Sequence, residues 1–122
     1  MIHITLPFPA PSLMPNRASG KHWTTTREAK TAAFGRAYAL TYAAVQKHTG
    51  EWFPLTGQVP LKITFAMPDK RGRDLDNLLA ASKHSIDGIA TALTINDKMF
   101  SPITIVRGEV VKGGAVLVEV GL

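Results

Sequence analysis

All five aspartates of the chain lie in one window, from Asp69 to Asp97, and this window opens on a basic cluster. The sequence from Met67 to Asn77 reads MPDKRGRDLDN. Clustered carboxylates offer the hard oxygen ligands that Mg²⁺ or Mn²⁺ prefers, and neighbouring guanidinium and ammonium groups bind phosphate. The combination therefore predicts metal-assisted chemistry on a phosphodiester.

These carboxylates have to be positioned by the elements around them. We expect a strand over Val59–Met67 and then a helix over Asp76–Ala92. On one continuous helix, Asp76, Lys83 and Asp87 would project within about 20° of one direction. One helical face would then present acids on either side of a lysine.

Two further acids flank the expected helix. Asp74 would lie between the strand and the helix, and Asp97 follows Asn96 shortly before the next expected strand. A sheet could return that later loop to Asp74. Asp74, Asp76 and Asp97 are therefore the candidate ligands of one or two Mg²⁺ ions, which would lower the pKa of a bound water.

Each of these residues also has an ordinary structural explanation. Asp76 could cap the free N–H groups at the start of a helix. Lys83 and Asp87 could form a surface ion pair four residues apart, and Asn96-Asp97 could be a turn. The basic cluster could be a solvated loop. Their conjunction in one short window is what favours a site.

The rest of the chain predicts a small α/β domain. A short strand, Ile2–Leu6, precedes a proline-rich loop, and a capping box over Thr25–Glu28 starts an alanine-rich helix, Thr25–Lys47. Ile103–Val111 and Ala115–Val120 are typical of an antiparallel hairpin. The expected order is β-α-β-α-β-β, with a mixed sheet and two flanking helices in a single domain of 122 residues.

The composition excludes several classes of protein. The apolar fraction of 45% and the charged fraction of 19% are globular values. The chain has no cysteine, which excludes thiolate zinc sites and cysteine nucleophiles. No apolar run is long enough for a transmembrane helix and no signal peptide is evident, so we expect a soluble cytoplasmic protein without a membrane partner.

The charge is unevenly distributed. The formal net charge is +5, and the only acids before Asp69 are Glu28 and Glu51, against seven lysines and arginines. A basic surface with few acids favours a polyanionic partner, most often nucleic acid. The alternative is a basic soluble protein with no such partner.

The motif MPDKRGRDLDNL, residues 67–78, resembles the central motif of the RusA-type Holliday-junction resolvases. The opening Ile4–Pro9, with Ser12 and Asn16, is similar to that family's opening, and so is the Lys112-Gly113-Gly114 turn near the end. Two positions depart from the family pattern. Ala80 stands where the family has its important lysine, and Asn96 replaces the first Asp of a later pair. A three-residue insertion after Leu79, or a change of register, would bring Lys83 to the lysine's place.

The resemblance implies a Mg²⁺-dependent, homodimeric endonuclease, with Mn²⁺ as a possible substitute, that cuts four-way DNA junctions and is often encoded by prophages. The family's catalytic acids map onto Asp74, Asp76 and Asp97, and Lys83 is the candidate for the missing lysine. The expected DNA contacts come from two loops: Lys70, Arg71 and Arg73 in one, and Asn16, Arg17 and Lys21 in the other. Two rival hypotheses are a junction-binding protein without cleavage activity and a metal-dependent hydrolase of a small phosphorylated substrate.

Overall fold

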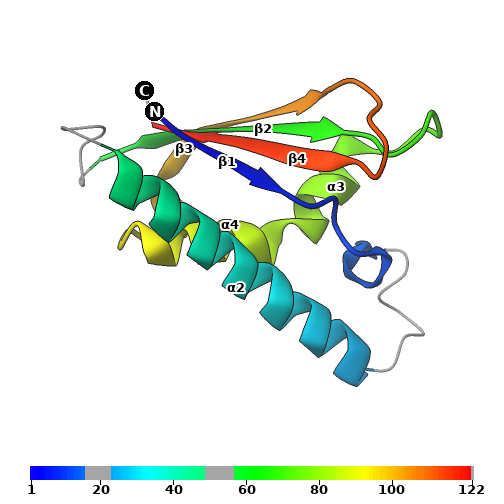
Figure 1. The fold of residues 1–122 in the computed structure, drawn as a ribbon, viewed down its shortest axis with the longest axis horizontal. Coiled ribbons are helices and arrows are strands. Elements are labelled where there is room, and N and C mark those ends of the chain that lie inside the picture. The colour runs from blue at the N-terminus through cyan, green and yellow to red at the C-terminus, as the bar shows by residue number, and fades with distance from the viewer. Residues whose placement is uncertain (16–22, 49–56, 122) are drawn as a thin grey trace.

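The computed structural model describes residues 1–15, 23–48 and 57–121. A four-stranded sheet has its helices on one face (Figure 1). The strands are β1 (Ile2–Leu6), β2 (Val59–Ala66), β3 (Phe100–Arg107) and β4 (Ala115–Val120). Their order is β1-β4-β2-β3, with β4 antiparallel to β1 and β2, and with β3 parallel to β2. The predicted α/β class with a mixed sheet is confirmed.

The predicted hairpin of the last two strands is wrong, because β2 lies between β3 and β4. β3 ends at Arg107, and the chain then crosses the end of β2. The backbone N–H of Gly108 donates to the carbonyl of Phe65 at 2.9 Å. That of Val111 donates to the carbonyl of Met67, also at 2.9 Å. These bonds carry the connection past β2, so that β4 pairs on its other side.

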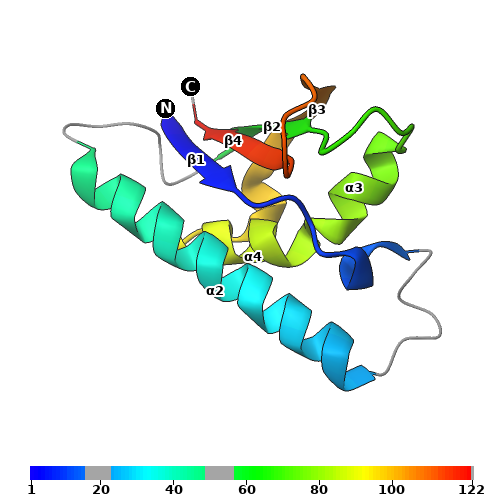
Figure 2. The same cartoon turned by 45° about the vertical axis from the view of Figure 1, so that its right-hand side comes forward.

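The long helix α2 (Trp23–Lys47) crosses beneath the sheet and packs beside α4 (Figure 2). It begins two residues before the predicted start, so Thr25 lies inside the helix and not at its N-cap position. On the α4 side of this contact, Gly88 faces the backbone of α2. A Cβ placed on Gly88 of α4 would lie only 2.4 Å from the carbonyl oxygen of Phe34. The two helices therefore approach as closely as their backbones allow.

The helix predicted over Asp76–Ala92 is in fact two helices, α3 (Leu75–Ala81) and α4 (Lys83–Ala92). Ser82 separates them, with φ −93° and ψ 2°, in the sparsely allowed bridge region. Its buried hydroxyl donates to the carbonyl of Leu78 at 2.9 Å, a back-bond that bends helices. Residues before and after Ser82 therefore lie on different helices, and the predicted single face does not exist.

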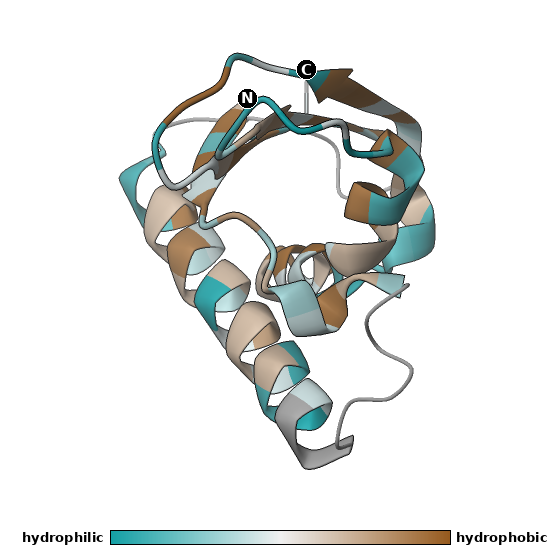
Figure 3. Ribbon diagram, turned by 90° about the vertical axis from the view of Figure 1, so that its right-hand side faces the viewer, coloured by the Kyte–Doolittle hydropathy of each residue, from teal (hydrophilic) through white to brown (hydrophobic). Residues whose placement is uncertain are grey.

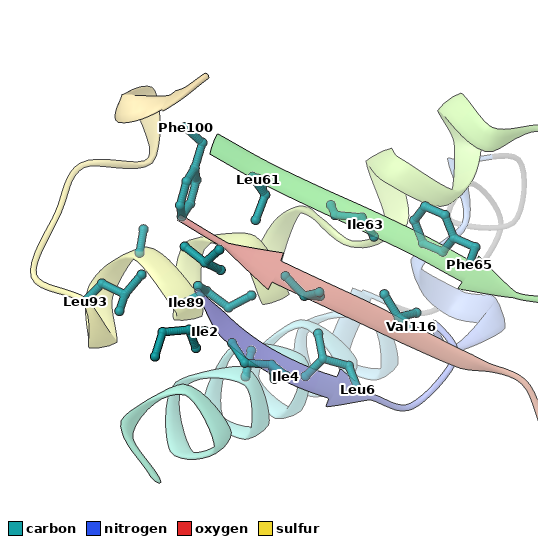
Figure 4. Packing of buried hydrophobic residues seen from close by; sticks show 14 of the residues in the cluster. Ile2, Ile4, Leu6, Leu61, Ile63, Phe65, Ile89, Leu93, Phe100 and Val116 are labelled. Atoms are coloured by element: carbon teal, nitrogen blue, oxygen red, sulfur yellow. The ribbon is translucent and has the colours of Figure 1, made fainter. Parts of the chain in front are cut away.

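The core lies between the sheet and these helices (Figure 4). Apolar residues recur along the strands (Figure 3). In β1, β2 and β4 every second residue of the strand points inward and is buried. Leu78 of α3 and Ile89 of α4 are fully buried against them. The inward residues of β1, β2 and β4 are Ile2, Ile4, Leu6, Val59, Leu61, Ile63, Phe65, Val116, Val118 and Val120. The core thus attaches both short helices firmly to the sheet.

No helix in the described part of the chain has the length and apolar character needed to cross a membrane.

Candidate active site

Two of the predicted acids flank the start of α3. Asp74 occupies the N-cap position but makes no side-chain capping bond, and Asp76 lies in the first turn. The alternative that Asp76 caps this helix is therefore wrong, because the cap position belongs to Asp74. Both residues are exposed. Their carboxylates face solvent beside the positive end of a helix, where they can meet a cation or a partner.

Lys83 opens α4 and faces two carboxylates. Its Nζ lies 3.7 Å from Asp87 Oδ1 and 3.6 Å from Asp97 Oδ2. The ordinary ion pair expected between Lys83 and Asp87 is present. The contact with Asp97 was not predicted, because it joins α4 to the short 3-10 turn η2 (Asp97–Met99), which packs beside α4.

The break at Ser82 explains the position of this lysine. Ser82 falls within the three residues after Leu79 that would form the insertion, if Lys83 is aligned with the family's lysine in that way. In one straight helix those residues would carry Lys83 about 4.5 Å further along the axis. Because α3 ends before Ser82, Lys83 instead begins a new helix and turns towards Asp97.

Asn96 has a structural role beside the contact between Lys83 and Asp97, which we call the Lys83–Asp97 corner. It is the N-cap of η2, and its side-chain oxygen accepts the backbone N–H of Lys98 at 2.9 Å. This supports the alternative that Asn96-Asp97 forms a turn. The turn does not exclude Asp97 from the site, because it presents the Asp97 carboxylate to Lys83.

The basic loop, which carries Lys70, Arg71 and Arg73, is held in shape by bonds to Asp69. The backbone N–H of Arg71 donates to Asp69 Oδ1 at 2.9 Å. Arg73 donates from both terminal nitrogens, to Oδ1 at 2.7 Å and to Oδ2 at 3.2 Å. The hydrogen bonds from Arg73 have the largest effect and the backbone bond from Arg71 the next largest. Together they hold the pKa of the Asp69 carboxyl far below its usual range. The bond to Asp69 also raises the pKa of Arg73.

Arg73 is held from several sides, whereas its neighbours face solvent. Its guanidinium carbon lies 5.5 Å from the ring centre of Phe8, and its side chain is only 16% exposed. Arg107 donates to the Arg73 carbonyl at 2.8 Å. The side chain of Arg71 is 77% exposed, and Lys70 is also exposed. Of the three expected phosphate contacts, Lys70 and Arg71 are thus accessible while Arg73 is bound to Asp69.

The expected metal ligands do not form a closed cluster. Across residues 1–15, 23–48 and 57–121, no three acidic, histidine or cysteine side chains are placed so that they could hold a metal ion together. The donor chemistry of Asp74, Asp76 and Asp97 nevertheless fits Mg²⁺. This ion commonly takes one or two protein carboxylates and completes its shell with waters and substrate phosphates.

The second expected DNA-binding loop, with Asn16, Arg17 and Lys21, lies outside the described residues.

The role of Asp69 was missed in the sequence, where it was grouped with the other acids. A usable signal was its spacing, since Arg71 and Arg73 follow two and four residues later. An aspartate readily bonds the backbone N–H two residues on, as Asp69 does here. That turn brings the next basic side chains back over the carboxylate.

Comparison with known proteins gives two relatives that cover most of the chain. The first is an uncharacterized protein of Xylella fastidiosa, 36% identical over 120 residues, or 98% of this chain and 76% of that protein. The second is named crossover junction endodeoxyribonuclease rusA, from Enterobacteria phage 82. It is 33% identical over 114 residues, or 92% of this chain and 87% of that protein. No family model matches the chain.

Proposed function

The chain belongs to the family of the RusA crossover junction endodeoxyribonuclease, and we propose that it is itself a Mg²⁺-dependent enzyme that cuts four-way DNA junctions. The observation that carries the proposal is the contact of Lys83 with Asp97. Ala80 leaves the family's lysine position without a charge. The break at Ser82 nevertheless supplies a lysine at one of the proposed catalytic acids.

In this proposal Asp74, Asp76 and Asp97 hold the metal. When bound, Mg²⁺ lowers the pKa of a water and offsets the charge of the scissile phosphate. The three carboxylates are the chain's own contribution to this step, since hard oxygen ligands suit the ion. Asp74 and Asp76 are exposed and come from a single short turn, so their side chains can adjust to a metal ion without unfolding α3.

Lys83 has two tasks in the proposed reaction. It orients the Asp97 carboxylate, which it faces at 3.6 Å. It also offers a positive charge to the negative charge that develops on the phosphate and the leaving oxygen. Its side chain is 65% exposed, so it can turn towards DNA when DNA arrives.

The basic loop positions the DNA. Lys70 and Arg71 bind flanking phosphates, which sets the register of the duplex without reading its bases. Arg73 supports this role indirectly, because its bonds to Asp69 hold the loop in shape. A junction needs two matched cuts, so we propose a two-fold homodimer with two equivalent sites, acting in the cytoplasm.

A second candidate is a branched-DNA binding protein with weak or lost cleavage activity. It is favoured by one observation, the alanine at position 80. The nearest candidate to replace the family's lysine, Lys83, is already paired with two carboxylates. If those pairs persist on DNA, the lysine would bind acids rather than assist the reaction. Asn96 instead of a second acid points the same way.

A gel assay on a labelled synthetic four-way junction separates these functions. With Mg²⁺ or Mn²⁺ we expect paired, symmetric nicks near the branch point, and none with a chelator or on a linear duplex of the same sequence. The Asp74→Asn protein, purified in the same way, controls for contaminating nuclease. Tight junction binding without nicks in either metal would support the second candidate. Hydrolysis of small phosphate esters without junction binding would contradict both.

A further inference from the structure

A groove of about 660 Å³ lies between the segment that follows β1 and the basic loop. One wall is apolar, with Pro9, Pro11 and Met14. The other carries Arg71, Arg73 and Asn77. Its volume falls in the range of roughly 300–1,000 Å³ that is usual for small-ligand sites, and its mixed walls suit a ligand with a flat apolar part and a charged part.

The end of the groove at Phe8 is firmly built. Arg73 lies over one side of the ring and is itself held by Asp69. The backbone of Gly114 contacts the same residue, since a Cβ on this glycine would lie 2.9 Å from Phe8 Cβ. The groove is therefore formed before any ligand binds, which reduces the ordering cost of binding.

One cation of the groove is available to an anion. Arg71 directs Nε to Asp69 at 3.3 Å, while its side chain is 77% exposed. A guanidinium has five N–H donors in a planar fork, so the remaining donors can bind a phosphate. Arg73, with both terminal nitrogens on Asp69, contributes shape rather than a free charge.

The groove leads directly to the proposed active site. Asn77, which lines it, follows Asp76 in the first turn of α3. A DNA strand with its scissile phosphate at Asp74 and Asp76 would place an adjoining nucleotide at the mouth of the groove. Asn77 also offers an amide donor and an acceptor to the edge of a base.

We infer that this groove seats one unstacked nucleotide of a branched DNA strand, with its base on the apolar wall and its phosphate at Arg71. The inference rests on the proposed function, because it takes branched DNA as the substrate of the same site. A duplex backbone would need only the cations, whereas the wall of Pro9, Pro11 and Met14 matches the flat face of a base. A base that has lost a stacking neighbour at the branch point also costs less to unstack than one within a duplex.

The first test replaces single bases. Wild-type protein is titrated in chelator with four-way junctions in which one nucleotide at or beside the branch point is abasic. At one position the affinity should fall roughly tenfold, the effect expected when one seated base is lost. Unchanged affinity at every position overturns the inference.

The second test asks whether that base occupies this groove. Met14→Ala removes part of the apolar wall, and Gly72→Gln adds a side chain at the rim, where a Cβ meets no atom within 4 Å. Each should weaken binding of the intact junction several-fold, with little further loss on the abasic junction, because both changes remove the same contact. Gly72→Gln removes no packing, so it remains informative if Met14→Ala folds poorly.

The matched control is Gly35→Gln on α2, whose Cβ also meets open space and which does not line the groove. It should bind both junctions as the wild type does. If, for both groove variants, the loss of affinity adds in full to the loss caused by the abasic nucleotide, the base lies elsewhere and the inference is overturned. Junction binding that never depends on a base would leave the proposed function intact, whereas failure of the wild type to bind any junction would overturn both.

Discussion

Two aspartates in this region meet their cations in different ways. Asp69 accepts bonds from the backbone of Arg71 and from both terminal nitrogens of Arg73, the shortest at 2.7 Å. Asp97 meets Lys83 at 3.6 Å, beyond hydrogen-bonding distance, and the same lysine faces a second acid. One carboxylate is thus fully engaged, while the other shares a single, largely exposed cation with Asp87.

The difference follows from how each pair is held. Asp69 and its arginines lie within four residues of one another, and the bidentate geometry of Arg73 is among the stronger ionic contacts. Lys83 and Asp97 come from separate elements, and the lysine is 65% exposed, so water screens their attraction. We therefore expect the basic loop to act as a preformed support and the Lys83–Asp97 pair to exchange partners in the proposed reaction.

The largest effect is expected from the acids. Asp74→Asn, Asp76→Asn and Asp97→Asn should each lower junction cutting by at least about 100-fold, because neutral amides are poor Mg²⁺ ligands. Binding should persist or tighten, since repulsion between carboxylate and phosphate is removed. Single-turnover cleavage with a parallel binding titration measures both, with Glu28→Gln as the control. Normal cutting by the Asp97 variant would exclude that residue from the site.

Lys83 comes next, because it tests whether the corner is catalytic. Lys83→Ala should reduce single-turnover cutting roughly 10–100-fold while junction binding changes little. Adding Ala80→Lys to that variant tests whether the lysine position of the family can be restored. If the pair is only a surface contact worth about 0.3–0.5 kcal/mol, Lys83→Ala will cut at the wild-type rate, and our comparison fails.

The close packing of α4 against α2 supports the Lys83–Asp97 corner. It can be tested by measuring the free energy of unfolding of two glycine variants. Gly88→Ala should lower the free energy of unfolding by about 1–3 kcal/mol, because the new methyl meets the Phe34 carbonyl oxygen. Gly35→Ala, in the exposed interior of α2, should instead raise it by about 0.5–1 kcal/mol. Denaturant unfolding compares the two. Stabilisation by both changes would show that the helices are not in close contact.

The basic loop should separate into two roles. Arg71→Ala should lower the slope of log K against log salt by about 1, because one phosphate contact is lost. Arg73→Ala should lower the melting temperature more than Arg71→Ala does, since it removes the bidentate bond to Asp69. Salt-dependent junction titrations and thermal unfolding measure the two effects. An unchanged slope for Arg71→Ala would mean that its side chain remains in solvent on DNA.

The smallest expected effect is on the stability of the protein at low pH. The pKa of Asp69 is depressed in the folded protein, so its stabilising contribution is present above the unfolded pKa of about 3.9 and is lost as the pH falls below it. The melting temperature of the wild type should therefore fall more steeply than that of Asp69→Asn between about pH 5 and pH 2. The difference should be modest because the carboxylate is 43% exposed. Parallel curves would mean that the loop contributes nothing to folding.

Much of this protein can be predicted from its sequence, because the signals are local. Period-two alternation located β1, β2 and β4 closely, with Leu61, Ile63 and Phe65 on the inward face of β2, and the motif from Met67 to Leu78 identified the family. The third strand was predicted over Ile103–Val111, whereas β3 spans Phe100–Arg107. The loop at Asp69 also depends only on residues two and four positions away, although its role was not recognised. Such features depend on a few consecutive residues, and their geometry changes little with context.

Tertiary structure decided the rest. Alternation indicates which face of a strand is buried but not which strand lies beside it, so the insertion of β2 between β3 and β4 was missed. Helical periodicity continues through Ser82, so the break between α3 and α4 was not predicted; the bond of its buried hydroxyl to the Leu78 carbonyl favours a bend there. The contact of Lys83 with Asp97 follows from that break, because packing of η2 beside α4 brings together two residues that share no local pattern.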